Sequence, residues 1–268
     1  MKTVNSKLRA VRAGPKIIAI TLLALATGCF AQPNGGPESN AKAAGNTVLI
    51  TGANRGIGLE LTRQYTAAGW QAIGTARKPE NAEALRALNA HVLQLDVTDQ
   101  QSVDRMANDL ANVPIDLLIN NAGILPLMHS ISDVDFDDVN RAMAVNTIGP
   151  MRVTRALLSN LRSGDAKMVV NITSQLGSIA NNSGGGFYGY RESKAALNMF
   201  TRSLANELRG DGFICVVVHP GWVQTDMGGA NATLTVGESA QGIRSVIEKL
   251  SPEDSGTFWN YDGEPLPW

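Results

Sequence analysis

Short apolar runs alternate with longer amphipathic segments from residue 46 to the end of the sequence. Six of these runs are rich in β-branched and other aliphatic residues, which is typical of strands buried on both faces of a sheet. The predicted strands are residues 46–50, 71–75, 91–95, 115–119, 167–172 and 213–218. Helical patterns lie between them at residues 57–68, 100–111, 137–161 and 190–208. This alternation predicts an α/β fold in which right-handed crossovers build one parallel sheet flanked by helices.

The segment before residue 46 has a different pattern. Residues 1–16 are basic and polar, and residues 17–28 form an uncharged run of twelve that is short for a membrane span but suits the core of a signal peptide. We therefore predict that residues 1–28 are a signal peptide or a lipoprotein-type leader. Residues 29–45, rich in Gly, Asn, Pro and Ala, are predicted to be a flexible tether. Residues 46–268 form the predicted folded domain.

The leader leaves the localisation open. Its end, L-A-T-G-C, resembles a lipoprotein box with lipidation at Cys29, although Ala26 stands where a larger aliphatic residue is usual. Cleavage after Ala31 is a second interpretation, and an unstructured extension with a true start near Asn46 is a third. We expect a periplasmic or lipid-anchored protein of the cell envelope if the leader functions, and a cytoplasmic protein otherwise. Membrane anchoring is expected only through this leader.

Length, charge and residue counts indicate a single domain and argue against nucleic-acid and metal binding. The 268 residues suit one sizeable core, and therefore a single domain. The formal net charge is −1, but the five basic and no acidic residues of residues 1–28 leave the predicted domain acidic. Such a domain lacks the basic stripe that nucleic-acid binding needs, so no nucleic-acid partner is expected. The two cysteines and three histidines show no metal-ligand spacing, and we expect no metal site.

The first predicted strand leads into a glycine-rich turn, T-G-A-N-R-G-I-G at residues 51–58, and then into a helix. Glycines let the backbone approach a pyrophosphate, and the helix N-terminus faces its negative charge. The alternative is a tight turn without a ligand. Together with the parallel sheet, the turn predicts a Rossmann-type, doubly wound fold in a single domain that binds a dinucleotide.

The end of the second predicted strand indicates which dinucleotide. An NAD enzyme is expected to carry Asp or Glu there, but the chain has Ala76-Arg77-Lys78 and no carboxylate before Glu80. Arg55 adds a positive charge inside the glycine-rich turn. Arg55 and Arg77 together can clamp a 2′-phosphate, which favours NADP(H) over NAD(H). The alternative is that both arginines are solvated surface residues.

Polar residues also follow the other predicted strands, at the carboxyl ends where such sheets bind ligands. Asp96 is placed to meet the adenine amino group or to cap the next helix. Thr225 follows the Pro220-Gly221 turn and is placed either to bond a carboxamide or to begin the next segment.

Tyr190 and Lys194 stand four residues apart at the start of a predicted helix and so share one face. An ammonium beside a phenol favours the phenolate, and we expect the pKa of Tyr190 to lie below its usual ~10. Ser174, at the end of the fifth predicted strand, offers a hydroxyl that polarises a carbonyl oxygen. A surface Tyr and Lys on an ordinary helix is the alternative. The cofactor loop upstream and the Pro-Gly turn downstream favour the catalytic interpretation, with Tyr190 as proton donor.

Asn146 lies inside the predicted helix 137–161, close to Gly149-Pro150. Asn and Pro are both unfavourable in the middle of a helix. A kink there would aim the main-chain carbonyl of Asn146 at a water molecule; the alternative is an ordinary irregular helix.

These motifs, in this order, resemble the short-chain dehydrogenase/reductase family over residues 46–268. The glycine-rich turn, Asn120-Asn121-Ala122-Gly123, the Ser174 element, Y-R-E-S-K at residues 190–194 and the Pro220-Gly221 turn carry the resemblance. Longer stretches are similar to the branch that holds the Sniffer carbonyl reductases and the bacterial C-factors. They are T-G-A-N-R-G-I-G-L-E, Y-R-E-S-K-A-A-L-N, H-P-G-W-V-Q-T-D-M-G-G and N-Y-D-G-E-P-L-P-W.

The resemblance implies a proton relay of Asn146, Ser174, Tyr190 and Lys194, in which Lys194 also holds the nicotinamide ribose. It also places Asp96 at the adenine, Asn121 beside the adenosine and Thr225 at the nicotinamide. The expected cofactor-binding residues are Gly52, Asn54, Arg55, Gly56, Ile57, Gly58, Arg77, Asp96, Val97, Asn121, Ala122, Gly123, Tyr190, Lys194, Pro220, Gly221, Val223 and Thr225.

One departure from the family concerns the distance between Ser174 and Tyr190, which is longer than in many members. The insert 181–186 is expected to bulge as a flexible loop over the pocket, and Ser174 remains a better candidate than Ser178. A mostly apolar substrate pocket, which suits a permissive carbonyl substrate, is expected from Ile124, Leu125, Gln175, Leu176, Phe187, Tyr188 and Trp222.

The resulting hypothesis is an oxidoreductase that reduces an aldehyde or ketone to an alcohol with NADPH and the Ser-Tyr-Lys-Asn relay. Its partners would be a small-molecule carbonyl or alcohol and further copies of the chain. The resemblance suggests a homodimer or homotetramer through the predicted helices 137–161 and 190–208. The alternative hypothesis, which the C-factor resemblance allows, is a signalling or binding protein of the cell envelope that keeps the nucleotide fold. The intact relay argues against it, because a pure binding protein needs no Tyr190–Lys194 pair.

Overall fold

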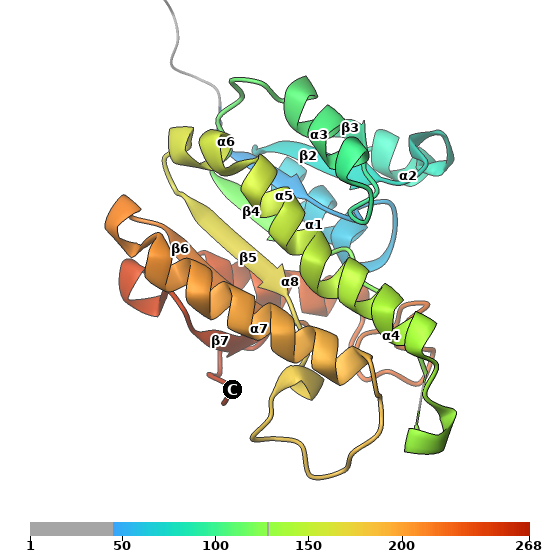
Figure 1. Ribbon diagram of the computed structural model, residues 1–268. Helices are drawn as coiled ribbons and strands as arrows, with labels where there is room; N and C mark the ends of the chain where they lie inside the picture. Colours follow the sequence, from blue (N-terminus) through green and yellow to red (C-terminus); the bar gives the residue numbers. More distant parts are fainter. Residues whose placement is uncertain (1–44, 128) are drawn as a thin grey trace, which may run out of the picture. The chain divides into compact units, whose positions relative to one another are not determined.

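The computed structural model describes residues 45–127 and 129–268. The predicted leader and nearly all of the predicted tether therefore lie outside the described residues. Seven strands in the described part form one sheet, and every pair of neighbours is parallel (Figure 1). They are β1 (Thr47–Ile50), β2 (Gln71–Ala76), β3 (His91–Gln94), β4 (Leu117–Asn120), β5 (Met168–Ile172), β6 (Ile214–His219) and β7 (Phe258–Asn260).

The strand order is β3-β2-β1-β4-β5-β6-β7. The chain therefore leaves β1 in one direction, through β2 and β3, and returns to the other side of β1 with β4. Loops that leave two neighbouring strands in opposite directions open a crevice at the carboxyl end of the sheet. This switch between β1 and β4 confirms the doubly wound, single-domain α/β fold.

Helices cover both faces of the sheet. Figure 1 shows α3, α5 and α7 in front of the strands, with α1 and α8 behind them. None of the helices in the described residues combines the length and apolar character needed to cross a membrane. The α-helices are α1 (Gly56–Ala67), α2 (Glu83–Arg86), α3 (Gln100–Asp109), α4 (Phe136–Met143), α5 (Gly149–Ala156), α6 (Leu158–Ser163), α7 (Tyr190–Glu207) and α8 (Val236–Ile247).

Strand alternation divides the core into two layers. Val48 and Ile50 of β1 pack into one cluster with Leu61 of α1, whereas Leu49 packs into a second cluster with Val103 of α3. All five side chains are fully buried. Successive side chains of a strand point to opposite faces, so a continuous apolar run is required where both faces carry helices. The sheet is thus held between two dry layers, and polar groups gather at its carboxyl edge.

The helix predicted at residues 137–161 is present but is not one regular helix. The chain forms α4, a π-helical segment at Ala144–Ile148, α5 and, after a break at Leu157, α6. Asn146 sits in the π-helical segment, so the structure has a widened turn where the sequence predicted a kink. Close packing accompanies the irregularity, because a Cβ on Gly149 would lie 2.8 Å from Cγ2 of Val97.

The sequence analysis did not predict α8, the short α2 or the seventh strand, β7. A signal for α8 is present: Thr235 and Glu238 form a capping box, with Thr235 Oγ1 accepting from the Glu238 amide at 3.2 Å and Glu238 Oε2 accepting from the Thr235 amide at 2.8 Å. For β7 the local pattern is weak, because its three residues are defined by pairing with β6.

Candidate active site

The glycine-rich turn between β1 and α1 forms one wall of a cleft. Gly52 and Gly56 have φ angles of 65° and 55°, a left-handed conformation that favours glycine. Gly58 has no room for a side chain, because a Cβ there would lie 2.5 Å from both Asn121 Nδ2 and Gly52 O. Arg55, the N-cap of α1, makes no side-chain capping bond within the described residues. The turn thus brings bare backbone to a helix N-terminus, which is a suitable cradle for a phosphate anion.

Asn121 ties this turn to the end of β4. Its Nδ2 donates to the main-chain oxygens of Thr51 at 3.0 Å and Gly52 at 3.2 Å. The hydroxyl of Thr51 in turn accepts from the amides of Asn121 at 3.0 Å and Ala122 at 3.1 Å. Asn121 therefore fixes the geometry of the turn, in addition to lining the cavity beside it.

Asp96 lines the cavity and does not cap a helix. Asp96 Oδ1 accepts from Thr98 N at 2.9 Å and Thr98 Oγ1 at 2.7 Å, whereas the cap of α3 is Asp99. Burial raises the pKa of the Asp96 carboxyl, but the Thr98 hydrogen bonds and the charge of Arg77 outweigh it, so the pKa lies below its ordinary value. A carboxylate is thus held at the end of β3, where an adenine amino group can donate to it.

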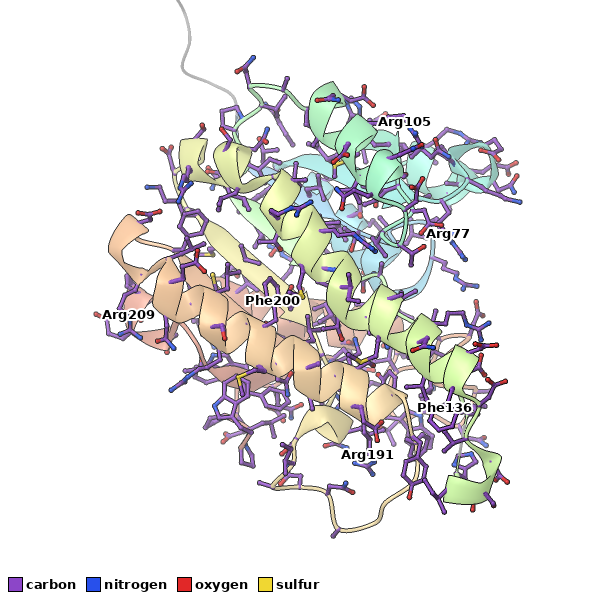
Figure 2. All side chains as sticks on the ribbon, in the orientation of Figure 1. Arg77, Arg105, Phe136, Arg191, Phe200 and Arg209 are labelled. Atoms are coloured by element: carbon purple, nitrogen blue, oxygen red, sulfur yellow. The ribbon has the colours of Figure 1, made fainter. Side chains whose placement is uncertain are left out.

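The two arginines expected at a 2′-phosphate both line the cavity. Arg77 directly follows β2, and its place is labelled in Figure 2. Arg55 is ion-paired with Asp226, with 2.6 Å between Nη1 and Oδ2, and the two side chains are 70% and 76% exposed. Asp226 follows β6, so the pair spans the cleft from the glycine-rich turn to the opposite wall.

The cleft encloses a cavity of about 570 Å³. Its lining comes from the carboxyl ends of six strands and the segments that follow them, as expected for a dinucleotide site. The lining residues predicted from the sequence are Gly52, Asn54, Arg55, Gly56, Ile57, Arg77, Asp96, Val97, Asn121, Ala122, Gly123, Ile124, Tyr190, Lys194, Pro220 and Thr225. Those that sequence reasoning missed are Ala76, Leu95, Thr98, Arg141, Val145, Ile172, Thr173, Gln224, Asp226, Met227 and Val236. Proximity to a strand end would have indicated Thr98, Thr173 and Gln224, but nothing local points to Arg141.

Three predicted cofactor residues stand outside this lining. Gly58 is packed beneath the turn, as described above. Gly221 has a φ of 83°, and a Cβ on it would lie 2.3 Å from Cδ1 of Leu234, so this glycine is required by the turn itself. Val223 is buried and pairs with Leu234 in an isolated bridge. All three shape the walls without reaching the cavity.

Tyr190, Ser174 and Lys194 are brought together where β5 ends and α7 begins. The Ser174 hydroxyl lies beside the Tyr190 phenol and acts to lower its pKa. Lys194, one helical turn later, donates from Nζ to the main-chain oxygen of Ile172 at 2.9 Å and lies 5.8 Å from the centre of the Tyr190 ring. Tyr190 and Lys194 face the cavity, whereas Ser174 is buried behind its wall.

The pKa expected for Tyr190 is wrong in direction. Burial raises the pKa of its phenol to about 12, and the interaction with the Ser174 hydroxyl opposes this only in part. Burial also lowers the pKa of Lys194 to about 8. The sequence argument considered only the attraction between phenolate and ammonium and omitted the loss of water around both groups. The Lys194 ammonium donates to a carbonyl of β5, and the phenol remains protonated at pH 7.

His219, at the end of β6, is a further buried group near Lys194. Burial lowers its pKa to about 4; the Lys194 charge acts in the same direction, and Asp262 opposes both. Its Nδ1 has no hydrogen-bond partner among the described residues. The imidazole is therefore neutral at pH 7 and adds no charge beside Lys194.

Asn146 uses its side chain to join three elements. Oδ1 accepts from the Ile124 amide at 2.9 Å, and Nδ2 donates to Ile124 O at 2.9 Å and to Ser193 Oγ at 3.0 Å. The amide group is completely buried and does not line the cavity. Asn146 thus positions the segment after β4 against α7, and its predicted role toward a water molecule stays a prediction.

Of the expected substrate residues, only Ile124 lines the cavity. Leu125, Leu176, Phe187 and Tyr188 are half-buried in the surrounding loops, and Gln175 is exposed. Trp222 is 53% exposed, and its indole donates to Gly228 O at 2.8 Å. The structure therefore leaves these six residues outside the cavity lining, and their contact with substrate stays a prediction.

Comparisons with known proteins agree with this architecture. Residues 46–234 match the family described as short chain dehydrogenase. The C-signal of Myxococcus xanthus is 49% identical over 162 residues, which cover 60% of this chain and 98% of that protein. A 1-hydroxy-2-glutathionyl-2-methyl-3-butene dehydrogenase from Rhodococcus sp. (strain AD45) is 34% identical, with 83% of this chain and 100% of the relative covered.

Two solved structures are similar over nearly the whole described part. The carbonyl reductase Sniffer of D. melanogaster has a TM-score of 0.79 at 36% identity, with 84% of this chain and 100% of the other covered. An NADPH-bound carbonyl reductase from chicken fatty liver has a TM-score of 0.77 at 35% identity, with the same coverage. These similarities confirm the predicted relationship to the Sniffer and C-factor branch. The chain belongs to the short-chain dehydrogenase/reductase family of oxidoreductases.

Proposed function

We propose that this protein is an NADPH-dependent carbonyl reductase, which converts an aldehyde or ketone into an alcohol. One observation carries the proposal: a protonated, buried Tyr190 phenol, with the Ser174 hydroxyl and Lys194 beside it, faces the cavity that the glycine-rich turn and two arginines also line. A proton donor and a phosphate cradle on one cavity suit reduction of a carbonyl group by a nucleotide cofactor.

The residues present fit an NADP(H) cofactor. Gly52 and Gly56 present bare backbone to the cavity where a pyrophosphate would lie, Asp96 suits the adenine end, and Arg55 and Arg77 suit a 2′-phosphate. The chicken carbonyl reductase binds NADPH, and a similar short-chain dehydrogenase/reductase from Burkholderia multivorans was crystallised with NADP. When bound, this cofactor supplies the hydride that reduces the carbonyl carbon.

The chain's own residues then have separate tasks. Tyr190 holds the substrate oxygen and transfers its proton to that oxygen as negative charge develops, while the Ser174 hydroxyl acts on the Tyr190 phenol from behind the cavity wall. With a pKa of about 12, the phenol is in the donating form throughout the neutral range. Lys194 stabilises the charge that Tyr190 acquires once its proton has left. Asn146 positions Ile124 and α7 around the reacting group.

A substrate panel tests the proposal directly. Purified protein is mixed with NADPH or NADH and a series of aldehydes and ketones, and nucleotide oxidation is followed by absorbance. We expect turnover of several apolar carbonyl compounds and a clear preference for NADPH. Preference for NADH would reject the roles of Arg55 and Arg77, and binding of NADPH without oxidation by any carbonyl compound would reject the enzyme.

A signalling or binding role is the second candidate, and the similarity to the C-signal of Myxococcus xanthus favours it. In that case the nucleotide site would serve stability or sensing, and the substrate panel would give no turnover. Tyr190→Phe would then leave biological activity intact. The ordered Ser174–Tyr190–Lys194 group supports the enzyme over this candidate.

We propose that the protein assembles through the outer faces of α5 and α7. Ile148 and Met151 are 40% and 42% exposed around the start of α5, and Met199 on α7 is 67% exposed. Apolar side chains of this size are favourable at the core of an interface between copies. Light scattering of wild-type protein and Met199→Glu tests this: we expect a dimer or tetramer that the charge weakens.

Export or anchoring through residues 1–28 is also a proposal. Mass measurement of the native N-terminus tests it, because an unprocessed Met1 contradicts cleavage, whereas a lipid adduct on Cys29 supports anchoring.

A further inference from the structure

The loop between β5 and α7 adopts a conformation that needs support. Gly185, Gly186 and Phe187 have consecutive φ angles of 65°, 67° and 54°. The left-handed region costs glycine little, but it costs a bulky residue such as Phe187 roughly 1–2 kcal/mol. The insert 181–186 is mostly exposed, so burial of its own side chains does not provide the compensation.

Arg191 provides it. Its Nε donates to Gly186 O at 3.0 Å, its Nη2 to Gly185 O at 3.1 Å and its Nη1 to Leu176 O at 3.3 Å. The guanidinium also lies 5.9 Å from the centre of the Phe187 ring. One planar side chain therefore joins both ends of the loop, which a lysine cannot do with its single ammonium. Figure 2 shows Arg191 at the start of α7, beside this loop.

The loop that Arg191 holds touches the loop that follows β4. The rings of Phe187 and His129 are 5.0 Å apart between centres and inclined by 82°, an edge-to-face contact. Gly186 also approaches His129 closely, because a Cβ on it would lie 3.3 Å from His129 O. Ile124 of that second loop lines the cavity, so the loop that Arg191 holds is linked to the cavity lining through its contact with His129, and we call these two loops together the two-loop wall.

We propose that Arg191 is a positioning residue that fixes this two-loop wall relative to Tyr190, and that the wall selects bulky apolar carbonyl compounds such as aryl ketones. The inference rests on the proposed carbonyl reduction. Arg191 directly follows Tyr190 in α7, so the wall is fixed to the same helical turn that carries the proton donor. Apolar groups border the site on several sides, with Ile124, Ile172 and Met227 in the cavity lining and Trp222 exposed nearby in sequence. A fixed wall lowers the ordering cost of binding for a substrate large enough to reach it.

Arg191→Lys tests the proposal in the full-length protein, with Arg209→Lys as the matched control. Arg209 stands just beyond the opposite end of α7, and its Nη2 bonds Asn206 at 3.4 Å (Figure 2). We expect Arg191→Lys to raise the KM of an aryl ketone about five- to tenfold, as the loss of roughly 1 kcal/mol implies. The kcat and KM of propanal, too small to reach the wall, and the Kd of NADPH stay within about twofold. Arg209→Lys leaves all four values unchanged.

Hydrogen exchange gives a readout that does not depend on turnover. We expect faster exchange in Arg191→Lys at residues 178–188, including the Gly185 amide that bonds Asn182 Oδ1 at 3.1 Å, and unchanged exchange in the rest of α7. The effect of Phe187→Ala on the aryl-ketone KM should largely disappear in the Arg191→Lys background, because both residues act through the same wall.

Two results overturn the proposal. If Arg191→Lys impairs the reduction of propanal and of the aryl ketone equally, Arg191 supports the helix as a whole. If the KM of the aryl ketone is unchanged, the two-loop wall does not select between substrates. If wild-type protein reduces neither compound with NADPH, the proposed function fails instead, and the exchange data then decide separately whether Arg191 holds the loop.

Discussion

Among single residues, Tyr190 is the group whose chemistry the structure defines most directly. Tyr190→Phe removes the proton donor and leaves the ring packing, so we expect kcat to fall about 10²–10⁴-fold while the Kd of NADPH stays unchanged. Tyr65→Phe is the matched control, because the Tyr65 hydroxyl is buried in the core without a hydrogen-bond partner among the described residues. Stopped-flow turnover and fluorescence titration measure the two quantities. Wild-type turnover of Tyr190→Phe contradicts the assignment.

Burial of the charged Lys194 ammonium lowers the free energy of unfolding. Its pKa falls from 10.5 to about 8 on folding, so between these values the unfolded chain binds more protons and the free energy of unfolding contributed by Lys194 rises with pH. Below pH 8 the burial of its charge costs about 3 kcal/mol. Lys194→Met should therefore raise the free energy of unfolding at pH 7 and lose activity. The difference between the two proteins in urea unfolding should shrink from pH 8 to 10; a constant difference contradicts this.

Asp226 competes for Arg55 with the cofactor phosphate that Arg55 is proposed to bind. The carboxylate pairs with Arg55 at 2.6 Å across the cleft, so a 2′-phosphate has to compete with it. Exposed pairs contribute only about 0.2–1 kcal/mol, and we expect Asp226→Asn to tighten NADPH binding about two- to fivefold at low salt. Asp211→Asn, which breaks the pair with Arg162 at 2.9 Å, is the control. Equal NADPH affinity in all three proteins at low salt contradicts the competition.

At the scale of elements, the π-helical segment and the start of α5 are shaped by contact with the loop after β3. Gly149→Ala would place a Cβ 2.8 Å from Val97 Cγ2, and overpacking of this kind costs roughly 1–3 kcal/mol. Val97 lines the cavity, so we also expect weaker NADPH binding. Gly210→Ala is the control, because nothing lies within 4 Å of its added Cβ. Val97→Ala should rescue the Gly149→Ala protein in urea unfolding; failure of that rescue contradicts the packing argument.

The sequence predicts those elements whose signals are local. Apolar runs located six strands, and the glycine spacing of residues 52–58 located the turn that the structure places at the cavity. Asn146 and Pro150 indicated an irregularity in residues 137–161, but its π-helical form could not be predicted, because Gly149 meets Val97 only after folding. The predicted direction of the Tyr190 pKa shift was wrong for the same reason. The four-residue spacing shows that Lys194 is near, but it does not show the burial of the phenol, which raises the pKa by more than nearby groups lower it. The Arg191 contacts likewise depend on loop geometry that no residue pattern shows.

On the scale of the whole molecule, the last residue returns to the base of the loop that precedes the proton donor. The main-chain oxygen of Trp268 accepts from Ala180 N at 2.9 Å and from Ser178 Oγ at 3.2 Å. Its ring packs 5.6 Å from Phe258 of β7 and lies under the Arg202 guanidinium at 5.9 Å. Trp268 thus contacts the sheet edge through its ring and the base of the loop through its main-chain oxygen, and the packed ring holds that main chain in place.

Trp268→Ala should therefore affect stability and the loop together. Trp268 is 37% exposed, so loss of its partly buried ring should lower the free energy of unfolding by about 1–2 kcal/mol. We expect the Ala180 amide to exchange faster, and the KM of carbonyl substrates to rise more than kcat falls. Trp268→Phe, which keeps an aromatic ring against Phe258, should retain most of both properties. Unfolding in urea and hydrogen exchange measure the two effects, and a destabilised Trp268→Ala protein with unchanged exchange at Ala180 would show that the ring supports only the sheet edge.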